Sequence, residues 1–137
     1  ALTKQVIDFL YFILPQRTWK NPVRPAFLTH DVEEQKMYGT DPLIFRQITA
    51  RMAKEMLNAC QAVMKKANQL TIPLSIMAAE KDRIVSLKRI QQFFSIVQSP
   101  SKELKIFKGF YHELFHEQNR HEAFLALRNI LADIISS

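Results

Sequence analysis

The chain has 137 residues, of which 47% are hydrophobic and 23% charged, and its formal net charge is +6 at pH 7. These proportions exclude an intrinsically disordered chain, and the length fits one domain or a part of one. The Lys and Arg residues are dispersed along the chain, without a basic stripe interleaved with aromatic residues, so no nucleic-acid partner is expected. A single cysteine, Cys60, excludes an intramolecular disulfide, and the helical apolar pattern around it predicts a buried thiol.

The chain begins with a predicted helix. Residues 4–14 carry apolar side chains at helical spacing, and Pro15 ends this helix. The apolar run within it is broken by Asp8 and is too short to cross a membrane. Three prolines and Trp19 then predict an extended, irregular connection over residues 15–27.

Two further helices are predicted before residue 68. A short helix is expected over residues 29–38, with Thr29 or Asp31 as its N-cap, and Asp41-Pro42 predicts the start of a longer one. One side of this longer helix carries a stripe of apolar residues: Ile48, Met52, Met56, Ala59, Cys60, Val63 and Ala67. Such a stripe is typical of a helix packed on a core, but Met52 and Met56 also suit an adaptable surface that contacts an acyl chain.

After Gln69 the pattern changes to alternating strands and helices. Strands are predicted over residues 72–78 and 104–107, and helices over residues 86–98 and 119–135. The last helix is expected to bury Phe124, Leu127, Leu131 and Ile134. A crossover helix between the strands makes them parallel, so both strands end at the same edge of the sheet. Ligands bind at that edge in such sheets, and the loops that leave it carry Asp82 and His112.

His112 fits two different chemistries. Residues 112–116 spell H-E-x-x-H, the helical zinc motif of metalloproteases, with His116 as the second ligand. However, His112 follows a strand and the Gly109 turn closely, and His121 and Glu122 do not stand at the spacing of a third ligand. The other interpretation makes Asp82 and His112 the acid and base of a serine-hydrolase triad, in the chain order found on α/β sheets. The triad interpretation uses more of the sequence, so no metal is expected.

Four segments carry a family resemblance in the same order along the chain. Residues 73–85, from Pro73 to Val85, resemble the strand and acid loop of α/β-hydrolases of the monoacylglycerol lipase and lysophospholipase group, and residues 105–114 resemble their histidine loop. Residues 28–31 and 38–43 are similar to their cap. The resemblance implies an α/β fold in which residues 1–68 form a helical cap and residues 69–137 the C-terminal portion of the core. It also implies Asp82 as the triad acid and His112 as the triad base, with Ala79 standing where the family usually has glycine.

The nucleophile of the implied triad is not found in the sequence. No G-x-S-x-G occurs, and the two glycines, Gly39 and Gly109, have no serine neighbour. We therefore expect a C-terminal part of a serine hydrolase of monoacylglycerol or lysophospholipid, inactive on its own and without a cofactor. Its expected partner is an N-terminal half that carries the serine, or a second copy that covers an open sheet edge. The expected location is cytoplasmic, with possible peripheral membrane contact, and the alternative function is non-catalytic binding of a lipid or protein partner.

Overall fold

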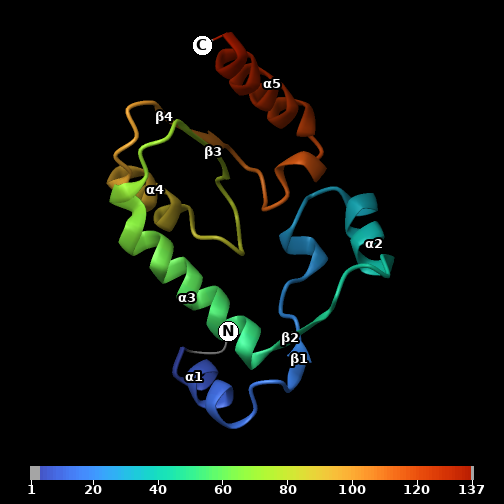
Figure 1. Ribbon diagram of the computed structural model, residues 1–137. Coiled ribbons are helices and arrows are strands. Elements are labelled where there is room, and N and C mark those ends of the chain that lie inside the picture. The colour runs from blue at the N-terminus through green and yellow to red at the C-terminus, as the bar shows by residue number, and fades with distance from the viewer. Residues whose placement is uncertain (1–3, 137) are drawn as a thin grey trace.

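The computed structural model describes residues 4–136, which alternate between helices and short strands (Figure 1). In chain order the elements are α1 (Lys4–Ile13), β1 (Thr18–Lys20), the 3-10 turn η1 (Pro25–Phe27), α2 (Val32–Thr40), β2 (Gln47–Thr49), α3 (Ala50–Lys66), η2 (Ala67–Gln69), β3 (Leu74–Ala79), α4 (Leu87–Ile96), β4 (Lys102–Phe107), η3 (Leu114–His116) and α5 (Arg120–Ser136). The strands form two separate two-stranded sheets, β1 with β2 and β3 with β4.

The first sheet joins two segments of the N-terminal half that are far apart in sequence. β1 pairs with β2 in antiparallel register, with Trp19 opposite Ile48. α1 packs against α3 at the lower end of Figure 1, where the Lys54 ammonium forms a hydrogen-bonded ion pair with the Asp8 carboxylate. The Lys54 hydrogen bond lowers the pKa of Asp8, so this contact holds a carboxylate against an ammonium at neutral pH.

The prediction that Asp41 caps the longer helix is wrong. The Asp41 carboxylate instead accepts a hydrogen bond from the backbone N–H of Leu43 at 2.8 Å, which closes a tight turn. β2 follows this turn, and α3 begins after the true N-cap, Thr49, whose hydroxyl accepts from the N–H of Met52 at 3.0 Å. Residues 47–49, which the sequence pattern placed in the longer helix, therefore form a strand that pairs with β1. The expected cap Asp31 of α2 is confirmed, because its carboxylate accepts from the backbone of Glu33 and Glu34.

The face of α3 that packs on its neighbours also differs from the expected stripe. Ala50 is buried and Ala53 and Leu57 are half-buried, whereas Met52, Met56, Val63 and Cys60 are exposed. The prediction of a buried Cys60 thiol is therefore wrong. A hydrophobic stripe does not reveal whether it packs inside the chain or lies on its surface.

The second sheet has the predicted parallel arrangement. β3 and β4 pair in register from Leu74 opposite Lys102 to Ala79 opposite Phe107, and α4 lies between them in sequence. The expected strands of residues 72–78 and 104–107 are confirmed with shifts of one or two residues at their ends. Within residues 4–136, β3 has β4 as its single neighbour, so its other edge has no strand beside it.

α5 packs on this sheet through small residues. The buried core cluster comprises Ala79, Phe107, Phe110, Leu114, Ala123 and Ala126. The prediction that Phe124, Leu131 and Ile134 are buried is wrong, because these side chains are 53%, 49% and 61% exposed. Alanine allows the helix backbone to lie close to the sheet, while the larger residues remain about half exposed, with the Phe124 ring in contact with that of Phe115 at a centroid distance of 5.0 Å.

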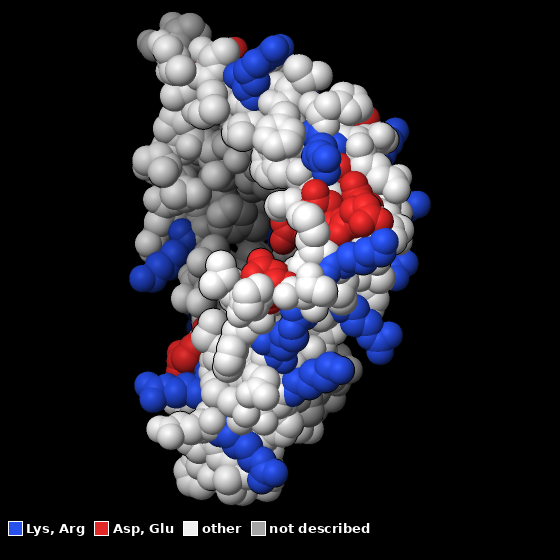
Figure 2. All heavy atoms as spheres, turned by 90° about the vertical axis from the view of Figure 1, so that its right-hand side faces the viewer, with Lys and Arg blue, Asp and Glu red and all other residues white. Residues whose placement is uncertain are grey.

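The accessible surface is large for the size of the chain. It amounts to 10071 Å², whereas a compact monomer of 16.0 kDa exposes about 7,400 Å². Figure 2 shows a deep hollow between the upper and lower parts of the molecule. Among residues 4–136, no helix is long and apolar enough to cross a lipid bilayer.

Candidate active site

Asp82 and His112 meet at the carboxyl end of the parallel sheet. Asp82 lies in the loop between β3 and α4, and His112 in the loop between β4 and η3. Asp82 Oδ2 and His112 Nδ1 are 2.8 Å apart, and the two side chains are 6% and 31% exposed. The juxtaposition expected from the sequence is therefore present as a short, largely buried hydrogen bond.

The Asp82 carboxylate is held by its own loop. Its Oδ1 atom accepts hydrogen bonds from the backbone N–H groups of Ile84 at 2.7 Å and Val85 at 2.9 Å. One oxygen thus anchors the carboxylate and the other faces the imidazole. This arrangement favours the tautomer with a proton on Nδ1, which leaves Nε2 as a hydrogen-bond acceptor.

Backbone bonds continue between the two loops beyond the ends of the strands. The N–H of Glu80 donates to the carbonyl of Phe107 and that of Lys81 to Phe110, both at 3.0 Å. Gly109, with a φ of 79°, makes the turn after β4, and its N–H donates to the Glu80 carboxylate at 2.9 Å. These bonds fix the separation of the acid loop from the histidine loop. Ala79 ends β3 with its side chain in the core.

The H-E-x-x-H segment does not form the helix that the zinc interpretation requires. His112 and Glu113 precede the short turn η3, and α5 begins only at Arg120. Nδ1 of His112 faces Asp82, while Nδ1 of His116 lies 3.4 Å from the Glu113 carboxylate. The two histidines therefore have separate acidic partners and do not share a helical face.

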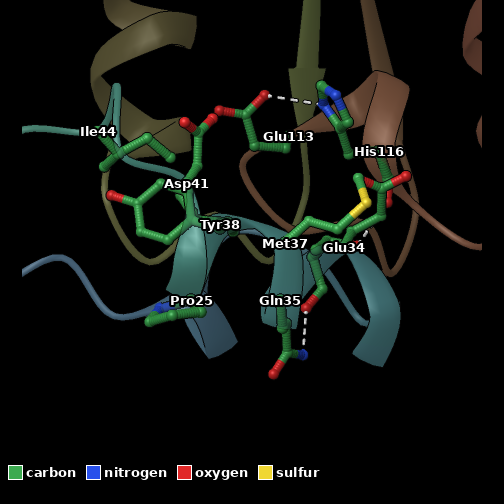
Figure 3. A pocket seen from close by; sticks show the side chains of 11 residues that line it. Pro25, Glu34, Gln35, Met37, Tyr38, Asp41, Ile44, Glu113 and His116 are labelled. Atoms are coloured by element: carbon green, nitrogen blue, oxygen red, sulfur yellow. Dashed lines mark hydrogen bonds and ion pairs between the residues drawn. The ribbon is translucent and has the colours of Figure 1, made fainter.

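A pocket of about 290 Å³ lies beside the histidine loop (Figure 3). Carboxylates of Glu34, Asp41 and Glu113 line it together with the Tyr38 ring and other apolar groups. The hydroxyl groups of a ligand in this pocket can donate hydrogen bonds to these carboxylates, and its hydrocarbon groups can contact the apolar side chains of the lining. Met52 and Met56 do not line this pocket; they lie on the exposed side of α3, with exposed fractions of 55% and 53%.

A buried polar cluster next to His112 was not predicted from the sequence. Glu117 accepts hydrogen bonds from the backbone N–H of Tyr111 and from Nδ1 of His30, both at 2.8 Å. The His30 and Tyr111 rings stack with their centroids 3.7 Å apart. In the sequence Glu117 is one acidic residue in a polar stretch, and its burial follows from a contact with His30, 87 residues away.

The chain belongs to the α/β-hydrolase family described as serine aminopeptidase, S33, whose family model matches residues 1–119. Its sequence is 32% identical over 89 residues to phospholipase YtpA of Bacillus subtilis and 29% identical over 109 residues to human monoglyceride lipase. These matches cover 64% and 79% of this chain but 34% and 36% of the relatives. A solved structure of Paleococcus ferrophilus monoacylglycerol lipase superposes with a TM-score of 0.86 at 23% identity, over 96% of this chain and 51% of that one. The expected α/β-hydrolase fold is confirmed, and the chain spans about half the length of this solved structure.

Proposed function

We propose that this chain supplies the acid and the base of a serine carboxylic-ester hydrolase that acts on monoacylglycerol or lysophospholipid. The observation that carries the proposal is the 2.8 Å bond between Asp82 and His112 at the carboxyl edge of the parallel sheet. Membership of the S33 family and similarity to proteins named monoglyceride lipase and phospholipase support the substrate class.

In the proposed reaction His112 moves a proton twice. A serine hydroxyl from outside this chain attacks the acyl carbon and gives its proton to Nε2 of His112, while Asp82 stabilises the imidazolium that forms. His112 then returns the proton to the departing alcohol as the ester bond breaks, which leaves an acyl-serine. Water releases the fatty acid along the same path, and the free serine and the neutral imidazole are restored.

We propose that residues 1–68 form the cap and bind the substrate, and that residues 69–137 carry the catalytic residues. The pocket beside the histidine loop is proposed to hold the polar head group, because its carboxylates can bond hydroxyls. Met52 and Met56 are proposed to contact the acyl chain, since both side chains are about half exposed. No cofactor takes part in this scheme.

The missing partner is proposed to be a polypeptide segment that carries the nucleophilic serine. One edge of β3 has no strand beside it in the described part of the chain, and it offers such a segment backbone groups, while the exposed Leu131 and Ile134 of α5 offer apolar surface. Self-association that covers the same edge is the alternative proposal. Without the segment that carries the serine, the chain is expected to hydrolyse no ester even if it self-associates, because the nucleophile and the oxyanion donors carry most of the rate.

The test is to produce this chain together with the coding sequence upstream of it and to measure hydrolysis of a monoacylglycerol. Activity should appear in the longer protein, vanish in His112→Ala and persist in His121→Ala, which changes an exposed histidine of α5. A folded, longer protein that binds lipid but hydrolyses no ester would instead support the non-catalytic function. Vesicle sedimentation of the same protein tests the proposed peripheral membrane contact.

A further inference from the structure

Glu117 is a buried carboxylate that the Asp82–His112 pair does not use. The residue is 3% exposed, and burying an ionised carboxylate is costly unless hydrogen bonds replace the lost water. Oε1 accepts from the N–H of Tyr111 and Nδ1 of His30, both at 2.8 Å, and Oε2 accepts from the N–H of His30 at 3.1 Å and of Gln118 at 3.3 Å. Four donors therefore converge on this one group within 3.3 Å, and the Thr29 hydroxyl lies 3.5 Å from Oε2.

The bond from Tyr111 closes the loop that carries His112. Tyr111 directly precedes His112, and Glu117 lies six residues after Tyr111. The closed loop is held from outside as well, because the N–H of Glu113 donates to the carbonyl of Leu28 at 2.8 Å. The hydroxyl of Thr29 donates to the carbonyl of His116 at 2.7 Å. His112 thus occupies a loop that is fixed at both ends.

Tyr111 also connects this loop to the acid loop. Its ring stacks on His30 at 3.7 Å with an interplanar angle of 27°. Its hydroxyl accepts a hydrogen bond from the guanidinium of Arg83 at 3.2 Å, and Arg83 is the residue after Asp82. A change at Glu117 therefore reaches both members of the Asp82–His112 pair through Tyr111.

We propose that Glu117 is the positioning residue of this site, which holds Tyr111, and through it His112, in place against Asp82. This inference rests on the proposed function. Burial raises the pKa of Glu117, but the hydrogen bonds from Tyr111 and His30 outweigh it and leave the pKa below its ordinary value. The group is therefore a carboxylate at neutral pH and accepts every one of these bonds, which a carboxamide of the same shape cannot do.

The experiment compares Glu117→Gln with Glu122→Gln, a change of an exposed glutamate in α5, in the longer protein that contains this chain. In Glu117→Gln, kcat should fall about 10- to 100-fold because the imidazole is misplaced, while KM changes less than about twofold. The low-field proton NMR signal of the Asp82–His112 hydrogen bond should weaken or disappear. Glu122→Gln should retain kcat, KM and the signal.

Two outcomes overturn the inference. One is a Glu117→Gln protein with a lower melting temperature but wild-type kcat and an intact low-field signal, which would make Glu117 structural alone. The other is a wild-type protein without that signal. If the wild type hydrolyses no ester, the proposed function fails, yet the signal still decides whether Glu117 positions His112.

A second variant covers the case in which Glu117→Gln does not fold. His30→Ala keeps the carboxylate but removes one donor and the ring stacked on Tyr111. It should lower kcat about fivefold, the equivalent of one hydrogen bond, and broaden the same signal. An unchanged kcat together with an unchanged signal in His30→Ala would contradict the proposal.

Discussion

Replacing Asp82 with asparagine tests the acid–base pair most directly. The asparagine carbonyl can keep the bonds from the N–H groups of Ile84 and Val85, because these meet one oxygen of the present carboxylate. Its NH₂ group would then face Nδ1 of His112 at the position where Oδ2 now lies at 2.8 Å. Two donors cannot bond each other, so the imidazole should shift its proton to Nε2 and lose its function as a base.

The expected loss of kcat is about 10⁴-fold, the magnitude seen when a serine protease loses its acid in this way, or about 5.5 kcal/mol of transition-state stabilisation. Stability should change by less than about 1 kcal/mol, since the loop keeps its anchors. Asp82→Ala should lose the same activity and also about 2 kcal/mol of stability, because it removes the acceptor of two backbone N–H groups.

The assay is the initial rate of ester hydrolysis by the longer protein, with urea unfolding of each variant to measure stability. The comparison of the two variants separates the chemical effect from the loosening of the loop. A folded Asp82→Asn protein that retains more than about a tenth of the wild-type kcat would refute the role assigned to Asp82.

Three further predictions follow from the packing and the charges. Because the pKa of Glu117 is lowered on folding, its contribution to stability is present above its unfolded-state pKa of about 4.3 and is lost as pH falls through the folded-state value. Between pH 7 and pH 3, the urea midpoint should therefore fall more for the wild type than for Glu117→Gln; equal falls would contradict the assignment. Ala123→Leu should destabilise the protein by about 1–3 kcal/mol, because Ala123 is fully buried in the core cluster. The control Ala62→Leu, on the exposed side of α3, should leave the stability unchanged, and urea unfolding measures the stability of both variants. The double variant Met52→Ala, Met56→Ala should raise KM for esters of long acyl chains and leave KM for esters of short acyl chains unchanged. The measurement is KM over a series of esters of increasing chain length. An equal change of KM for long and short esters would show that these residues do not contact the acyl chain.

The C-terminal half could be predicted from the sequence because its signals are local. The apolar run before Ala79, the helical pattern of residues 86–98 and the turn at Gly109 define β3, α4 and β4. Parallel pairing of the two strands brings Asp82 beside His112. The N-terminal half was predicted less well, since the start of α3 depends on the pairing of Trp19 with Ile48, two residues far apart in sequence.

Burial was the property that the sequence predicted worst. Leu131 and Ile134 have the spacing of a buried helical face, yet both are exposed, because the sheet that lies beside α5 consists of two strands within the described residues. The cluster of His30, Tyr111 and Glu117 could not be predicted from the sequence either. Its contacts join segments whose relative position is known only once the chain is folded.

The ladder of backbone bonds between the acid loop and the histidine loop has a consequence for how this protein can diversify. The bonds from Glu80 and Lys81 lie within residues 74–117, and no hydrogen bond in the described part of the chain joins residues 42–66 to either loop. Substitutions over that stretch, which includes most of α3, can therefore accumulate without moving His112 relative to Asp82. In relatives that keep these bonds, residues 42–66 can therefore vary in sequence while the geometry of the Asp82–His112 pair stays the same.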